Sequence, residues 1–425
     1  DERRAVDLAQ DIQTLLYWLG ESQAAQKVIC FPERQSHLLN RGLNDDGASR
    51  DRLYTLWRLS RGEHPIIVAS ATATAQPTIT KIDLESASFT LRPGDQVERT
   101  ELSKQLTELG YEYSNVVVSC GQFAIRGSVV DIFSPSYPVP SRIDFLDFEV
   151  DTVRVFDPQT QRTFTSETDD SEAVCLAVSE VCVNEKNSSA LADNFKEFAD
   201  QHQVPRSERQ RLLDRFAGSS QSTLQEELLS FIASKKIYLQ DHLPSAPSVH
   251  VVDLSLCEEQ LTHYRERYFE ATHLNSWERE WAQRQADWLL ENNRLCAPFT
   301  KKLWESPIAK SDNPVRYPQD LITQSEFASP AAVREKMDDG WDVTLFAYNA
   351  SQSERLNAIF NEEQKPRVLV GSLSTPIFIE ELQLALIPDR ILFGVEKRRV
   401  RSGVRRRYKS GTTDADLSLF PHHAP

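Results

Sequence analysis

The stretch that decides the fold reads GQFAIRGSVVDIF at residues 121–133, and SRIDFLDFEVDTVRVFDPQTQRT follows at residues 141–163. Apolar residues dominate both segments, as is typical of β-strands. The strands follow each other too closely to leave room for crossover helices, which indicates antiparallel pairing. We therefore predict a small β-rich module at residues 96–180, in which a helix at residues 98–110 precedes the strands and residues 147–149 form a tight turn.

Two arginines, Arg126 and Arg142, interrupt these apolar strands. Successive side chains of a strand point to opposite faces, so Arg126 points away from the face that carries Phe123 and Ile125. By the same alternation, Arg142 shares a face with Leu146. If the apolar sets form the core, both arginines stand on the outer face of one sheet, with Leu146 beside Arg142.

Two interpretations of this arginine pair are open at the level of the sequence. Two guanidinium groups beside an exposed apolar side chain are typical of an interface hot spot. Alternatively, each arginine pairs locally with a carboxylate of the same module, for instance Asp131, Asp144 or Asp147. The strand pattern alone does not choose between them.

The sequence on both sides of the module alternates strands with helices, which is typical of parallel pairing in a three-layer α/β domain. We predict one such domain, split into residues 1–95 and residues 181–295 by the inserted module. Its expected helices lie at residues 3–20 and 51–60, with a long charged tract at residues 257–292, and its expected strands lie at residues 27–31, 65–70, 236–241 and 248–255.

Three further segments complete the chain. Several prolines and a lack of periodicity predict a linker at residues 296–329. Residues 330–396 are predicted to form a separate small α/β domain, and residues 397–425 a polar, basic tail. The elements expected in the small domain are helices at residues 331–340 and 351–363 and strands at residues 341–349, 366–374 and 382–394.

The composition excludes several classes of protein. A net charge of −15 argues against nonspecific wrapping of DNA by the whole chain, because neutralising phosphates requires clustered Lys and Arg. No apolar run approaches the roughly 20 residues of a membrane helix. The cysteines form no Cys-x-x-Cys pair, as expected for reduced thiols in a cytosolic protein. We expect a cytoplasmic monomer with no membrane contact and no metal site.

One strongly basic run, KRRVRSGVRRRYK at residues 397–409, stands out from the acidic chain. Such a cluster contacts nucleic acid or another protein, or else it is a solvated linker that balances the acidic remainder. The candidate contact residues are Lys397, Arg398, Arg399, Arg401, Arg405, Arg406 and Arg407.

Catalytic motifs are missing from the sequence. It contains no nucleophile elbow, no HExxH, no GxGxxG and no phosphate-binding GxxxxGK[ST] loop. A nucleotide-hydrolysing α/β domain usually ends an apolar strand with Asp-Glu to hold Mg²⁺, but here Leu254 follows Asp253. We therefore predict no catalytic residue, no ATP hydrolysis and no cofactor in this chain. The alternative is that a first strand and its phosphate loop lie upstream of residue 1.

Residues 110–163 carry a family resemblance. Their GY pair, their F-x-x-RG-x-x-V-D-I-F core, their RIDF strand and the phrase FDPQTQRT are similar to the module shared by UvrB and bacterial transcription-repair coupling factors. The ending FDPQTQRT resembles the coupling factors more closely. Residues 33–50 also resemble the coupling factors more closely, because they form a short segment without tyrosine. UvrB carries there a long tyrosine-rich hairpin that inserts at damaged DNA. Residues 330–395 resemble the coupling factors' third domain, and residues 387–407 resemble the lead-out toward their RNA polymerase-interacting domain.

The resemblance implies a degenerate helicase-like parallel α/β domain with an inserted UvrA-binding module, followed by a small α/β domain. It implies a noncatalytic chain that brings UvrA, and with it nucleotide excision repair, to RNA polymerase stalled on damaged DNA. The binding positions of the family map onto Arg126, Arg142 and Leu146. An aromatic residue is common at the last position, so Leu146 is a departure that gives up contact area and stacking.

The same resemblance implies partners that other parts of a parent protein would bind. The parent would be an ATP-dependent DNA translocase, whose later domains bind RNA polymerase, DNA, ATP and Mg²⁺ and whose C-terminal domain masks the UvrA-binding surface at rest. The alternative function is a UvrB-like DNA-dependent ATPase of the excision nuclease whose phosphate loop is missing from this sequence. A third option is a standalone protein that never had a motor.

Overall fold

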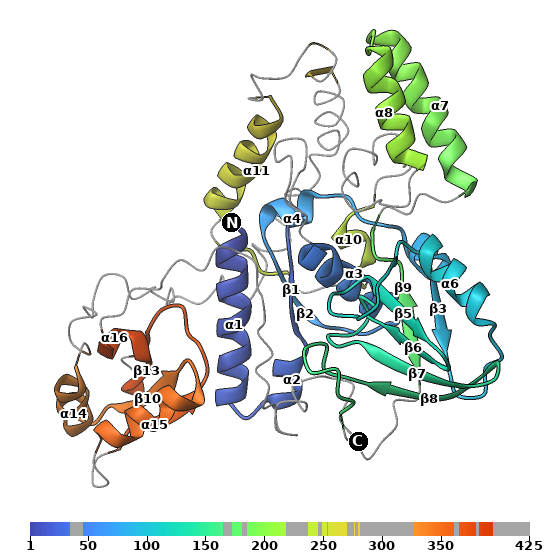
Figure 1. The fold of residues 1–425 in the computed structure, drawn as a ribbon. Helices are drawn as coiled ribbons and strands as arrows, with labels where there is room; N and C mark the ends of the chain where they lie inside the picture. Colours follow the sequence, from blue (N-terminus) through green and yellow to red (C-terminus); the bar gives the residue numbers. More distant parts are fainter. Residues whose placement is uncertain are drawn as a thin grey trace.

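The structure, a computed structural model, describes part of the chain and shows a mixed α/β fold (Figure 1). The described residues form four small β-sheets, and helices pack against them. The predicted linker lies almost entirely outside the described residues, and the basic run at residues 397–409 and Asp253 lie wholly outside them. The described residues are 1–34, 46–164, 172–180, 185–217, 237–244, 249–252, 254–269, 276, 279–280, 327, 329–360, 365–379 and 382–393.

The first sheet pairs two parallel strands, which confirms the prediction for residues 27–31 and 65–70. A helix covers each face, because alternate strand residues point to opposite sides: Val68 packs on α1, and Phe31 packs on α3. The elements of this part are α1 (Glu2–Trp18), β1 (Val28–Phe31), α3 (Asp46–Ser60) and β2 (Ile66–Ala69). Shorter helices around them are α2 (Ser22–Gln26), α4 (Ala71–Ala75) and α5 (Lys81–Ser86).

The two strands predicted after the module are wrong, so the parallel sheet is not extended by them. Ile237 makes a single antiparallel bridge to Thr78, and the chain then turns into the short helix α10 (Leu239–His242). The carboxylate of Asp241 accepts the backbone N–H of Tyr238 at 2.8 Å and so favours this helical turn. Residues 249–252 form no strand, and α11 (Leu254–Phe269) begins directly after Asp253.

The β-rich module forms a five-stranded sheet in the order β4-β5-β6-β7-β8. The pairs from β5 to β8 are antiparallel, as predicted, whereas the short β4 pairs parallel with β5. The tight turn at Asp147 is confirmed, with a φ of 57°, which aspartate tolerates. The elements are α6 (Arg99–Glu108), β4 (Glu112–Tyr113), β5 (Gln122–Arg126), β6 (Val129–Ile132), β7 (Ser141–Leu146) and β8 (Glu149–Val155).

Helix α6 packs Leu102 and Leu106 on the inner face of this sheet, against apolar residues such as Phe123 and Ile143. A two-stranded antiparallel sheet joins the module to the first part of the fold. Its strands are β3 (Ser88–Leu91) and β9 (Ala173–Leu176). Cys175 of β9 lies in the core of the module, while the neighbouring Val174 lies in the core around α3. The module is therefore anchored through a shared strand.

Two glycines of the opening stretch differ in what surrounds them, and this gives a matched test. Gly121 and Gly127 both have a positive φ, of 83° and 61°. A Cβ at Gly121 would lie 2.8 Å from a methyl carbon of Val178, whereas a Cβ at Gly127 would meet nothing within 4 Å. Gly127→Ala is expected to cost about 1–2 kcal/mol of unfolding free energy from backbone strain. Gly121→Ala should cost about 2–3 kcal/mol, since overpacking is added.

Urea unfolding of the two variants measures this difference. Equal midpoints for Gly121→Ala and Gly127→Ala would show that Val178 does not restrict the chain at residue 121.

Two helices follow the shared strand, α7 (Glu185–Gln201) and α8 (Arg206–Ala217). They pack against each other, with Phe195, Phe198 and Leu212 buried.

The last described part is an α/β unit with a four-stranded sheet in the order β11-β10-β13-β12. Strands β10, β11 and β13 are parallel, and β12 pairs antiparallel with β13. The strand predicted at residues 382–394 is half wrong, because it ends at Pro388, and Asp389 begins a helix. The elements are α14 (Pro330–Asp338), β10 (Asp342–Ala347), α15 (Ala350–Ile359), β11 (Arg367–Val370), β12 (Ile377–Ile379), β13 (Leu384–Pro388) and α16 (Asp389–Phe393).

Candidate partner-binding surface

Arg126 and Arg142 meet on the carboxylate of Asp131. Strand β6 lies between β5 and β7, and its Asp131 stands opposite Arg142 in the strand register. Asp131 is fully buried. Its Oδ1 accepts Arg142 Nε at 2.7 Å, its Oδ2 accepts Arg142 Nη2 at 2.9 Å, and Arg126 Nη2 donates to the same Oδ2. One buried carboxylate therefore orients two guanidinium groups.

The two arginines differ in how firmly they are held. Arg142 also lies over the Phe156 ring, 4.4 Å from its centroid, and donates to the carbonyl of Gln161 at 3.1 Å. Its hydrogen bonds to Asp131 raise its pKa above the ordinary value. Its side chain is only 17% exposed, whereas that of Arg126 is 45% exposed. Arg126 therefore presents N–H donors to solvent, and Arg142 supplies a fixed positive charge on the same carboxylate.

The local pairing of these arginines is confirmed, and their role as an interface hot spot stays a prediction. They lie on the face opposite the apolar core, as the strand alternation predicted. They also pair locally, and the partner of both is Asp131. The Asp144 carboxylate pairs with Arg154. Asp147 contacts a different arginine through its backbone, whose carbonyl accepts Arg99 Nη1 at 2.6 Å.

Exposed apolar side chains lie on the same module. Leu146 ends β7 and is 70% exposed, and Phe148 in the following turn is 58% exposed. The sequence reading missed Phe148, although an aromatic residue in a two-residue turn is a usable signal. Val116 and Val118 are also exposed, in a segment tied to Gln161 through the carbonyl of Val117 at 3.0 Å.

We call the outer side of the five-stranded sheet the arginine face, defined by Arg126, Asp131, Arg142 and Leu146. Its three charged groups carry a net charge of about +1, since one carboxylate balances one of two guanidinium groups. A positive group beside exposed apolar surface suits a protein partner that offers carboxylates and an apolar contact.

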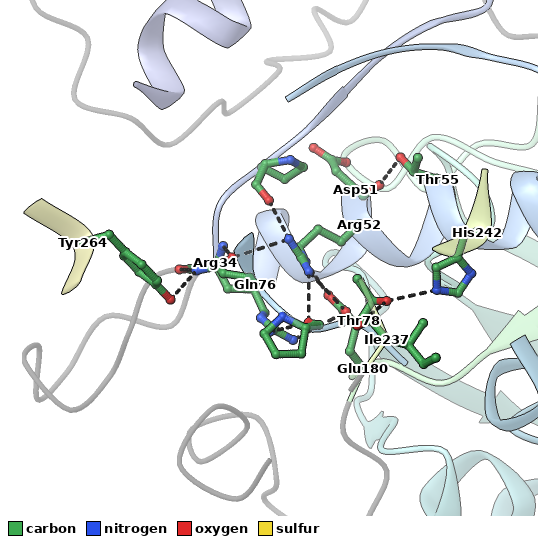
Figure 2. Close-up of polar contacts among 12 residues, drawn as sticks. Arg34, Asp51, Arg52, Thr55, Gln76, Thr78, Glu180, Ile237, His242 and Tyr264 are labelled. Carbon is green, nitrogen blue, oxygen red and sulfur yellow. Dashed lines mark hydrogen bonds and ion pairs between the residues drawn. The ribbon is translucent and has the colours of Figure 1, made fainter. Parts of the chain in front are cut away.

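A second polar cluster is buried in the first part of the fold and serves a different purpose (Figure 2). Arg52 donates to both carboxylate oxygens of Glu180, and Arg34 Nη1 lies 3.4 Å from Glu180 Oε2. Arg52 also lies over the Phe31 ring at 4.2 Å. Burial alone would raise the pKa of Glu180, but Arg52 and Arg34 hold that pKa below its usual range. The side chains of Arg52 and Glu180 are inaccessible, so this cluster joins segments rather than binding a partner.

Gln76 and His242 extend this buried cluster. Gln76 Oε1 accepts the backbone N–H of Arg34 at 2.7 Å, and His242 Nε2 lies 2.9 Å from the Thr78 hydroxyl. Burial lowers the pKa of His242. The cluster thus connects residues that precede the module with Glu180, the last residue of the predicted module.

Within the described ranges, no three His, Cys, Asp or Glu side chains are grouped to hold a metal ion. None of the described helices is long and apolar enough to cross a membrane.

Comparisons with known proteins identify a domain family within the chain. Residues 89–171 match the family model of the UvrB interaction domain, a range that contains the whole arginine face. The transcription-repair-coupling factor of Myxococcus xanthus is 26% identical over 259 residues, which are 60% of this chain and 21% of that protein. Those of Bacillus subtilis and Escherichia coli are both 31% identical, over 156 and 112 residues, which are 37% and 26% of this chain.

The chain matches about a fifth or less of the length of these relatives: the matched segments are 21%, 12% and 10% of the three proteins. The resemblance read from residues 110–163 is confirmed by the match to the family model and by these relatives. This chain is homologous to the amino-terminal portion of transcription-repair-coupling factors and contains a UvrB interaction domain.

Proposed function

We propose that this chain is a recruitment region of a transcription-repair coupling factor and that it binds UvrA through the arginine face. One observation carries the proposal: the two arginines of the matched interaction domain are held together by Asp131 on the side of the sheet opposite its core. By bringing UvrA to a stalled polymerase, the chain would direct nucleotide excision repair to damage in transcribed DNA.

The chain is proposed to do this without catalysis and without a bound cofactor. The motor that hydrolyses ATP, moves along DNA and contacts RNA polymerase would belong to other parts of a longer protein, as would a domain that masks the arginine face at rest. These roles rest on homology to relatives that this chain matches over 21% of their length or less.

The arrangement of the arginine face explains how such a contact forms. Arg142 loses little side-chain freedom on binding, because Asp131, Phe156 and Gln161 already hold it. Pre-organised groups bind with a smaller entropic cost than mobile ones. The exposed Leu146 then supplies an apolar contact on the same strand face as Arg142.

A direct binding measurement tests the proposal. Purified UvrA titrated with this chain is expected to give saturable binding that weakens as salt rises, because a charged contact is screened. The chain alone, without UvrA, should hydrolyse no ATP above background. If UvrA and the chain do not associate at micromolar concentrations, the proposed function is wrong. An intact GxxxxGK[ST] loop in natural sequence upstream of Asp1 would favour the UvrB-like alternative instead.

Leu146 offers a test in both directions. Leu146→Ala is expected to weaken UvrA binding by about 1–2 kcal/mol, close to tenfold in Kd, because it removes an apolar contact that is exposed in the free chain. Leu146→Phe should strengthen binding, since an aromatic ring buries more area. Titration of UvrA measures both, with the exposed Ile82, outside the matched domain, changed to alanine as a control. No change for either Leu146 variant would remove this residue from the site.

A further inference from the structure

The four-stranded sheet of the last α/β unit has an apolar layer on each face. Alternate residues of its strands point to opposite sides, so Val343, Leu345 and Ile387 lie in one cluster, under α14, α15 and α16. The other face carries a second cluster, formed by Phe346, Leu384, Leu386, Leu369, Ile377 and Ile379. An apolar sheet face of this kind must be buried against another helix or sheet.

Helix α1 covers this second face from the other end of the chain. Leu15 and Trp18 pack into the Phe346 cluster, while Ala5 and Ala9 of the same helix pack against Val68 of β2. Figure 1 shows α1 standing between the β1–β2 sheet and the last α/β unit. The apolar residues of this helix therefore pack in two separate clusters.

Two polar side chains of α1 form hydrogen bonds with the segment at residues 371–374, which we call the clasp loop. The Thr14 hydroxyl donates to the carbonyl of Ser372 at 2.9 Å and accepts its N–H at 3.2 Å. The Asp11 carboxylate accepts the N–H of Ser374 at 2.6 Å and also its hydroxyl. Asp11 and Thr14 lie one helical turn apart, which is why both can reach the same loop.

The first residue of the clasp loop, Gly371, allows this close approach. A Cβ at Gly371 would lie 2.8 Å from Thr14 Cγ2 and 3.2 Å from Phe346 Cδ1. Its φ is not among the positive values of the chain, so the contact with α1 is the reason for a glycine here.

We propose that the clasp loop and the Phe346 face form an intramolecular docking site whose occupant is helix α1 of the same chain. The helix completes the last α/β unit as its third layer and couples it mechanically to β1 and β2. The site recognises a helix by a carboxylate and a hydroxyl three residues apart, followed in the next turn by apolar residues. The 358 positions that separate Thr14 from Ser372 make this a long-range contact.

Hydrogen exchange in the whole chain tests the docking site through a designed clash and its rescue. Gly371→Ala is expected to speed amide exchange in α1, β10 and β13 by about tenfold or more, the usual effect of overpacking. Exchange in β5 to β7 should not change. Adding Thr14→Ser removes the methyl carbon that clashes and keeps the hydroxyl, so the double variant should return most of the protection.

A second variant removes the hydrogen bonds of Asp11 and Thr14 to the clasp loop without adding side-chain volume there. Asp11→Ala with Thr14→Val should also speed exchange in α1, β10 and β13 by about tenfold to a hundredfold, because it removes hydrogen bonds to a charged group. Glu21→Ala, which removes an exposed carboxylate just after α1, is the matched control.

The outcomes separate clearly. Unchanged exchange in both variants, or no rescue by Thr14→Ser, would overturn the proposal. A dimer of the wild-type chain, with α1 of one copy on the clasp loop of the other, would overturn its intramolecular form. UvrA binding should be equal in all these variants, so the result does not depend on the proposed function.

Discussion

Replacing Arg126 and Arg142 together with alanine is expected to weaken UvrA binding by about 2–5 kcal/mol, or roughly thirtyfold and more in Kd. Both guanidinium groups lie on one face, held there by Asp131. Their removal takes away the positive charge and also exposes a lone buried carboxylate, so the arginine face becomes negative and repels an acidic partner. Titration of purified UvrA with wild type and variant measures the change.

A second variant keeps this test independent of folding. The double variant leaves Asp131 buried without its two partners, which destabilises the sheet. Arg126→Ala alone preserves both hydrogen bonds from Arg142 to Asp131, at 2.7 and 2.9 Å, so the sheet should stay folded. Its UvrA affinity should still fall.

Arg92 supplies the matched control for these variants. It is an exposed arginine of the same matched domain, paired with Glu172 at 2.7 Å, and it lies outside the arginine face. Arg92→Ala should bind UvrA like the wild type. Equal affinities for wild type, Arg126→Ala and the double variant would refute the arginine face as the UvrA contact.

The largest loss of stability is expected for Glu180→Gln. This change removes a negative charge that sits between Arg52 and Arg34 in a fully buried setting. Breaking a buried ion pair leaves an uncompensated charge in the interior and typically costs about 3–5 kcal/mol. Urea unfolding followed by circular dichroism should show a correspondingly lower midpoint.

The control for Glu180→Gln is an ion pair at the surface. Glu85 pairs with Lys81 across one helical turn, and both side chains are more than half exposed. Glu85→Gln should therefore change the unfolding free energy by about 0.5 kcal/mol or less. A similarly small effect for Glu180→Gln would mean that the cluster in Figure 2 does not stabilise the fold.

The same carboxylate predicts a pH dependence. The two arginines lower the pKa of Glu180 in the folded chain. At a pH near that pKa, the folded state therefore binds fewer protons than the unfolded state. The stability that Glu180 contributes is therefore fully present above its unfolded pKa of about 4.3 and is lost as the pH falls through its folded value. The difference between wild type and Glu180→Gln should be constant near neutral pH and shrink in acid.

The sequence was most informative where a local rule acts on neighbouring residues. Strand alternation placed Arg126 and Arg142 opposite the core, and the close spacing of the strands predicted antiparallel pairing from β5 to β8. Both follow from steric rules that operate within a few residues. The role of Arg126, Arg142 and Leu146 as UvrA contacts stays a prediction until binding is measured.

The same local rules failed at residues 236–255. Apolar alternation over a few residues is shared by a short strand and a buried helical turn, so the pattern could not distinguish α10 and the start of α11 from strands. The deciding contacts come from elsewhere: Leu239 packs into the core around α3, and Asp241 caps the turn.

The amino-acid sequence by itself thus determined the module, the face on which its arginines stand and the likeness to coupling factors. Only the tertiary structure decided that Asp131 serves both arginines, that Glu180 joins Arg52 across 128 positions and that α1 has two apolar faces. The physical reason is range. Strand and helix periodicity arise from backbone geometry over a few residues, whereas these contacts join side chains that only the folded chain brings together.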